Sequence, residues 1–181
     1  MFADRFFGRL FHFCAIVFAL GFSVVYAQEE SISEIRYKDD YDQLQRIIKI
    51  TDPAKRGDQM LIFYKGRTDI DPKIRAYGDN IFIKDLESLM NKGNYAALSN
   101  LSERAVRLRP RFGEAYLFYG VALKAGKKIS EAMNAFAKCY LIENQFKQKA
   151  KQLLDTTYRS ANRGSLIGED KLIKNAANEL K

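Results

Sequence analysis

The feature that most constrains the fold of this chain is the recurrence of helix start and stop signals along the sequence. Asp52-Pro53 and Asp71-Pro72 each join an aspartate suited to a helix N-cap with a proline suited to the first turn. Alternating runs bounded by Asn-Gly or Asp-Gly, which indicate strands, do not occur. We therefore expect an all-α chain of antiparallel helices joined by short links, spanning about 41–48, 53–64, 72–91, 95–109, 112–124, 130–143, 145–161 and 169–180.

A regular spacing connects the helices between residues 79 and 146. Gly120 follows Tyr116, and the small Ala132 and the aromatic Phe136 come in the next predicted helix. This pattern resembles the tetratricopeptide repeat, a helix–turn–helix unit of about 34 residues with preferred residue types at fixed positions. Placing Gly120 at position 8 puts Ala132 at position 20 and starts this repeat at residue 113, and one repeat length earlier another starts at residue 79.

The resemblance assigns ten residues to packing between the helices. Small residues stand where two helices approach closely, and large ones fill the spaces between helix pairs. Asp85, Leu98 and Ser102 depart from the family's residue types. An ordinary helical bundle would explain the periodicity but not the shared register. The packing residues are Phe82, Leu86, Gly93, Ala105 and Pro110 in the first repeat and Tyr116, Gly120, Ala132, Phe136 and Cys139 in the second.

The fold that the resemblance implies is a short right-handed α-solenoid of stacked helix pairs. Two repeats alone bury little surface, so additional helices are expected on both sides. Residues 28–78 would supply divergent N-terminal helices, residues 79–146 the two repeats, and residues 147–181 a capping helix and a tail helix.

Residues 1–27 have the composition of an export signal. Arg5 and Arg9 precede an apolar stretch, and Val25-Tyr26-Ala27 offers the small residues that signal peptidase requires. We expect this segment to precede the fold as a cleaved signal helix and to direct the chain to the periplasm. The alternative is an uncleaved inner-membrane anchor, since the apolar stretch of about 16–18 residues is at the short limit for a span.

Removing these 27 of the 181 residues leaves 154 residues with no histidine and one cysteine, Cys139. Histidine-dependent triads, histidine metal sites and internal disulfides are then excluded. Phosphate-binding glycine loops and the HExxH, GxSxG and CxxC motifs are also missing from the sequence. We therefore expect no catalytic residue, no metal and no cofactor, and interpret the chain as a non-enzyme.

A partner site follows from the resemblance, because the first helix of each repeat lines the concave face in that family. A mixed apolar and polar groove there favours an amphipathic helix or an extended peptide of a protein partner. The alternative is that Ile83, Leu117 and Val121 contact a neighbouring helix. The expected partner contacts are Asn80, Ile83, Glu87 and Met90, with Asn91, and Glu114, Leu117, Val121 and Lys124, with Ala125.

The chain without residues 1–27 carries a net positive charge, since it has 28 basic and 21 acidic residues. Basic clusters lie at 104–111, 124–128 and 147–151. These clusters are consistent with helix faces that simply contact solvent. Alternatively, they contact an acidic partner, anionic lipid headgroups or an anionic envelope polymer. Nucleic acid is not expected, since no reading module is visible.

The function predicted from these features is an exported scaffold or adaptor of the cell envelope that binds a protein or peptide. The alternatives are a membrane-anchored subunit of an envelope assembly, and a non-catalytic accessory domain of a cell-wall or polysaccharide enzyme complex.

Overall fold

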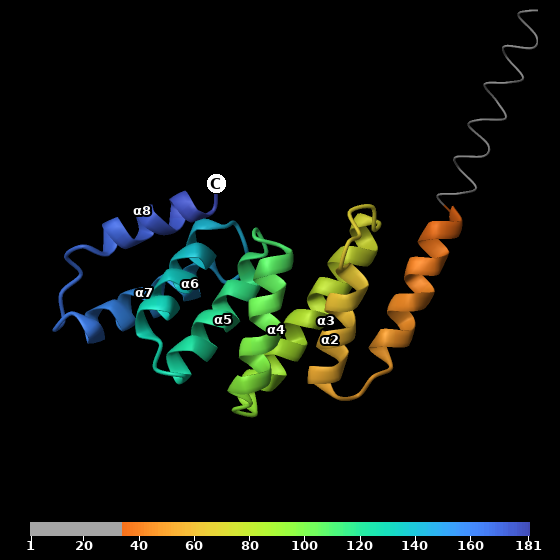
Figure 1. Cartoon of the computed structure of the whole chain (residues 1–181), viewed down its shortest axis with the longest axis horizontal. Helices are drawn as coiled ribbons and strands as arrows, with labels where there is room; N and C mark the ends of the chain where they lie inside the picture. Colours follow the sequence, from red (N-terminus) through yellow and green to blue (C-terminus); the bar gives the residue numbers. More distant parts are fainter. Residues whose placement is uncertain (1–33) are drawn as a thin grey trace, which may run out of the picture. The chain divides into compact units, whose positions relative to one another are not determined.

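The computed structural model describes residues 34–181, which are helical with no strand (Figure 1). The proposed signal segment 1–27 lies outside this range. Residues 34–48 are helical, and residues 44–181 form one compact unit. The expected helices are confirmed, most to within one or two residues at each end. They are α2 (Pro53–Tyr64), α3 (Pro72–Asn91), α4 (Tyr95–Leu108), α5 (Gly113–Ala125), α6 (Ile129–Leu141), α7 (Lys147–Ala161) and α8 (Glu169–Glu179).

Three helix starts use the capping side chains that the sequence predicts. The Asp52 carboxylate accepts a hydrogen bond from the backbone N–H of Lys55 at 2.7 Å, which closes the first turn of α2. Asp71 caps α3 and Asn94 caps α4 in the same way. Helix α6 differs, because it begins at Ile129 without a side-chain cap and so contains Ser130 in its first turn.

Asn144 ends α6 slightly earlier than expected. Its Nδ2 donates to the backbone carbonyls of Cys139 at 2.8 Å and Ile142 at 2.7 Å, and its Oδ1 accepts from the N–H of Phe146 at 2.8 Å. One side chain thereby satisfies carbonyls at the end of α6 and orients the link to α7. Asn144 stands where the repeat family usually has proline.

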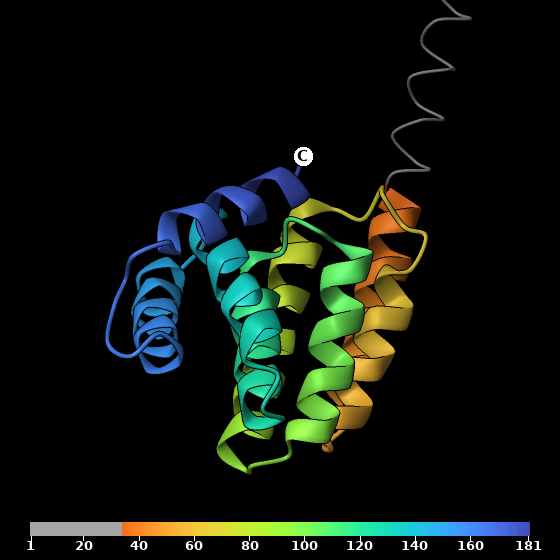
Figure 2. The ribbon, with the colours of Figure 1, turned by 60° about the vertical axis from the view of Figure 1, so that its left-hand side comes forward.

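Successive helices pack against one another through residues 53–161, so that α2 contacts α3, α3 contacts α4, and the order continues to α7 (Figures 1 and 2). Helix α2 also contacts α4, and α3 contacts α5. Helix α8 breaks this order, because it folds back onto α6. A single core runs through the unit, with Met60, Phe82, Leu98, Phe136 and Leu154 fully buried.

The spacing of the helix starts repeats within this unit. Helices α4 and α6 begin at Tyr95 and Ile129, and α5 and α7 begin at Gly113 and Lys147. In both pairs the second start follows the first by the repeat length that the sequence pattern predicts. Helix α8 begins later than this spacing would place it, after the longer link 162–168.

Helices α5 and α6 approach each other closely at Gly120. A Cβ built on Gly120 would lie 2.5 Å from Cε1 of Phe136, whose side chain is fully buried. No larger residue fits unless the Phe136 ring moves, so glycine sets the distance between these helices.

Two of the three departures from the repeat's residue types have partners that explain them. The Asp85 side chain is 1% exposed and accepts hydrogen bonds from the guanidinium of Arg56 on α2, one of them at 2.9 Å. The same guanidinium donates to the backbone carbonyl of Ile50 at 2.6 Å. The buried hydroxyl of Ser102 donates to the carbonyl of Leu98 at 2.6 Å. Both buried polar groups are therefore satisfied.

Candidate partner-binding groove

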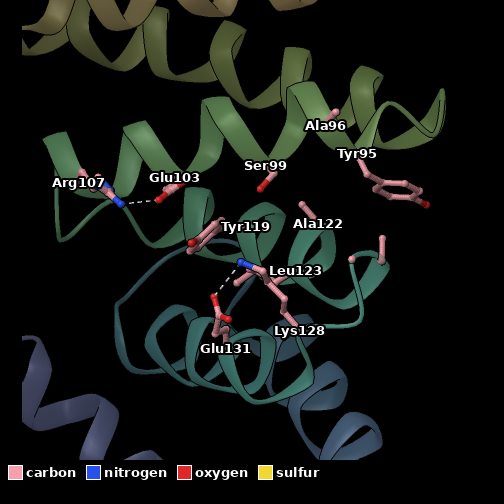
Figure 3. Close-up of a pocket in the computed structure, with 12 residues that line it drawn as sticks. Tyr95, Ala96, Ser99, Glu103, Arg107, Tyr119, Ala122, Leu123, Lys128 and Glu131 are labelled. Atoms are coloured by element: carbon pink, nitrogen blue, oxygen red, sulfur yellow. Dashed lines mark hydrogen bonds and ion pairs between the residues drawn. The ribbon is translucent and has the colours of Figure 1, made fainter.

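A groove of about 540 Å³ lies between α4 and α6, with α5 as its floor (Figure 3). We refer to it as the α4–α6 groove. Its residues come from three consecutive elements. They are Tyr95, Ala96, Ser99, Glu103 and Arg107 from α4, Tyr119, Ala122, Leu123, Ala125 and Gly126 from α5 and its C-cap, and Lys128 and Glu131 at the start of α6.

The α4 wall follows from helical periodicity. From Ala96 onward its residues recur at every third or fourth position and therefore share one face of the helix. Ala96 and Ser99 are small and leave room at one end of this wall, whereas the longer Glu103 and Arg107 stand at the other end. The α4 wall thus presents its smallest side chains beside the first turns of α4.

The rims of the groove are charged and its floor is largely apolar. The Arg107 guanidinium donates to the Glu103 carboxylate at 2.6 Å on one rim, and Lys128 lies 3.7 Å from Glu131 on the other. These exposed ion pairs contribute little to stability, so their groups remain available to a ligand. Burial raises the pKa of the Tyr119 hydroxyl, which stays neutral and able to donate near pH 7.

The structure changes the interpretation of the concave-face residues. Leu117 is fully buried and Ile83 is 6% exposed, because both side chains belong to the core that the packed helices enclose. Neither can contact a partner in this structure, and their assignment as partner contacts is corrected. Eight other residues were expected as contacts, and of these only Ala125 lines the α4–α6 groove. Four of the eight are exposed: Asn80, Asn91, Lys124 and Ala125. The other four are half-buried: Glu87, Met90, Glu114 and Val121.

Glu114 belongs instead to a polar cluster that joins α2, α3 and α5. Arg109 donates to both oxygens of Asp79, at 2.5 and 2.8 Å, and its guanidinium lies over the rings of Tyr64 and Phe112. Burial raises the pKa of Glu114, and Arg109 opposes that shift. Arg109 pairs with Asp79 and so ties these helices together, and Glu114 lies half-buried beside that pair.

The expected packing residues lie either buried between helices or exposed in the links that join them. Eight are buried between helices: Phe82, Leu86, Ala105, Tyr116, Gly120, Ala132, Phe136 and Cys139. Gly93 and Pro110 are exposed in the links, and Gly93 adopts a φ of 68° that favours glycine. Burial raises the pKa of the Cys139 thiol to about 12, so the thiolate is scarce at neutral pH.

Residues 34–181 contain neither a cluster suited to a metal ion nor a helix suited to span a membrane. No three histidine, cysteine, aspartate or glutamate side chains there come together as a metal ion would need. No helix within the same range is long and apolar enough to cross a membrane. Comparison of the chain with protein-family models, with curated proteins and with solved structures finds no match.

Proposed function

We propose that this chain is a tetratricopeptide-like scaffold that holds an amphipathic helical segment of a protein partner in the α4–α6 groove. The scaffold part of the proposal is supported by helix starts that recur at the repeat length and by the close contact of Gly120 with Phe136. Together these features favour stacked helix pairs, arranged as a short α-solenoid, over an irregular bundle.

The observation that carries the binding proposal is the way α8 docks on α6. Glu179 of α8 accepts from Lys138 at 2.7 Å and from Asn134 at 3.0 Å, and Ala176 is fully buried at the contact. Lys138 and Asn134 continue the helical stripe of α6 that begins with Glu131 in the groove. The outer stripe of α6 therefore already accepts one amphipathic helix at one end, and the groove extends it at the other.

The mode of binding follows from the lining. A partner helix would place apolar side chains against Tyr119 and Ala125, pass closely by Ala96, and place polar groups against the charged rims. Lys128 and Glu131 on one rim and Arg107 and Glu103 on the other would set its direction by complementary charge. The scaffold would act through non-covalent contact alone.

For location, we infer that residues 1–27 take the chain into the bacterial envelope, either to the periplasm as a free protein or to the inner membrane as an anchored subunit. N-terminal sequencing of the protein from envelope fractions separates the two. A start near residue 28 supports cleavage, and a start at Met1 supports the anchor. An accessory role beside a cell-wall enzyme requires that a catalytic subunit co-purifies.

The groove is tested by blocking it at positions that tolerate a larger side chain. Ala96 is exposed and Ser99 is half-buried, so Ala96→Arg/Ser99→Arg fills the groove along α4 without entering the core. A matched pair, Ala76→Arg/Asn80→Arg, adds the same charge to exposed positions of α3. Affinity capture from envelope extracts is expected to lose its partner with the groove pair only. Equal recovery from both, with both variants folded, would refute the groove.

A further inference from the structure

One edge of the molecule carries basic side chains at three helix ends. The α3–α4 turn and the α5–α6 turn lie together at the lower end of the unit, and α7 ends on the same side (Figures 1 and 2). Segments 91–95, 124–131 and 159–164 contain six basic residues and one acidic residue, Glu131. We call the six the basic edge: Lys92, Lys124, Lys127, Lys128, Arg159 and Arg163, all of them exposed.

Most of these charges have no ion-pair partner within residues 34–181. Lys128 pairs with Glu131 at 3.7 Å, and Arg159 lies near Asp155. Lys92, Lys124, Lys127 and Arg163 form no ion pair with any residue of the described range. In the other basic clusters, Arg104, Arg107, Arg109, Lys147 and Lys151 pair with carboxylates, whereas Arg111 and Lys149 form no ion pair within residues 34–181.

Two residues of the basic edge hold a backbone conformation that suits glycine. Lys127 has a φ of 61° and Arg163 a φ of 52°, and they are the non-glycine residues with positive φ within residues 34–181. A side chain in this region is strained against its own backbone. Both of these strained residues are basic, and both end a helix on the same side of the unit.

The turn one repeat length before Lys127 shows that the fold does not need a lysine there. Gly93 has a φ of 68°, and its N–H donates to Met90 while the next N–H donates to Leu89. Lys127 repeats this pattern of hydrogen bonds. Its N–H donates to the carbonyl of Lys124, and the N–H of Lys128 donates to the carbonyl of Leu123, at the same distances as in the Gly93 turn. Glycine makes the turn without strain in one place, so the lysine in the other carries a backbone strain that the turn itself does not require.

The spread of the charges indicates the shape of the ligand. Because they are distributed over three successive helix ends, a small anion would meet only one or two of them. Tyr95, which is 41% exposed, begins α4 directly after the turn that carries Lys92. Lysine beside exposed tyrosine is the side-chain combination that favours a membrane interface, where the ring enters the headgroup layer and the amine meets phosphate.

We propose that the basic edge rests on an anionic bilayer surface, with the ammonium and guanidinium groups bound to the phosphates of lipid headgroups. Each basic side chain near such a surface contributes about fivefold to the affinity, and the contribution is screened by salt. The basic edge shares Lys128 with the α4–α6 groove and lies beside Tyr95, which also lines it. The other five basic residues lie outside the groove, so the lipid contact can hold while the groove proposal fails.

The test is binding of the full chain to vesicles, by flotation, with anionic and with neutral lipid. Lys127→Asn/Arg163→Asn removes two charges from the basic edge, and asparagine tolerates positive φ. Lys65→Asn/Arg111→Asn removes two exposed charges from the links on the opposite side. The apolar N-terminal segment is common to all variants, so the difference between the two pairs reports the edge alone.

The basic-edge pair is expected to bind vesicles with 30% phosphatidylglycerol about 25-fold more weakly than the unaltered chain, given about fivefold per charge. Lys65→Asn/Arg111→Asn is expected to change this affinity less than about threefold, because salt screens charges that lie far from the membrane surface. Neither pair is expected to change binding to neutral vesicles. Equal losses from both pairs would overturn the proposal, because net charge alone would then explain them. It would also be overturned if the basic-edge pair lost affinity for soluble dextran sulfate but not for the anionic vesicles.

Discussion

The buried ion pair between Arg56 and Asp85 predicts a large and specific loss of stability. Replacing Arg56 by methionine keeps most of the packing volume but leaves the Asp85 carboxylate, 1% exposed, without its partner. Breaking a buried pair from one side costs about 3–5 kcal/mol. For a unit of this size, we expect a fall in Tm on the order of 10 °C.

The double variant Arg56→Met/Asp85→Leu separates the lost pair from lost packing. It removes both charges and places leucine where the repeat family has a large side chain, so we expect stability within about 2 kcal/mol of the unaltered chain. Urea and thermal unfolding of the full chain, followed by circular dichroism, measure both variants.

The pH dependence gives a second readout of the same pair. Burial raises the pKa of Asp85, and Arg56 opposes that shift. Without Arg56 the folded chain binds a proton at Asp85 more tightly than the unfolded chain does, so stability increases as pH falls. Arg56→Met should therefore regain part of its loss between pH 7 and about pH 5. The reasoning is refuted if Arg56→Met loses less than about 1 kcal/mol, a value well below the cost of a broken buried pair, or if the double variant is no more stable than the single one.

Two further predictions concern the contact of α5 with α6. Gly120→Ala should destabilise the chain by about 1–3 kcal/mol in urea unfolding, because the added Cβ would meet the Phe136 ring at 2.5 Å. Gly126→Ala is the matched control, since its Cβ would meet nothing closer than 3.5 Å; equal losses would contradict the close contact. Cys139 should react with a thiol reagent only after denaturation, since it is fully buried. Reaction of Cys139 itself in the native chain, located by peptide mapping so that Cys14 is counted separately, at the rate of an exposed thiol would show that α6 separates from α5.

The sequence was sufficient to predict the helices because the signals are local. Asp52, Asp71 and Asn94 cap the turns that follow them, and each cap depends on residues three positions away. The end of α6 lies slightly before the expected one because the Asn144 side chain binds the carbonyls of Cys139 and Ile142, which its residue type alone does not predict.

The surface was harder to predict because burial depends on residues distant in sequence. Helical spacing puts Leu117 on one face of α5 but does not say which neighbour covers that face. The return of α8 onto α6 depends on Glu179 meeting Lys138 and on Ala176, none of which forms a local pattern. The α4–α6 groove has one local signal in the sequence, the small residues Ala96 and Ser99 at the start of an amphipathic helix.

Site-specific photo-crosslinking tests most directly whether a partner lies in the α4–α6 groove. A benzophenone side chain at Ala96 stands inside the groove, and one at Asn80 stands on the exposed surface of α3. Irradiation of cells that produce each full-length variant should yield a covalent adduct to a partner protein from position 96 and none from position 80. An adduct from position 80 with none from position 96 would contradict the account.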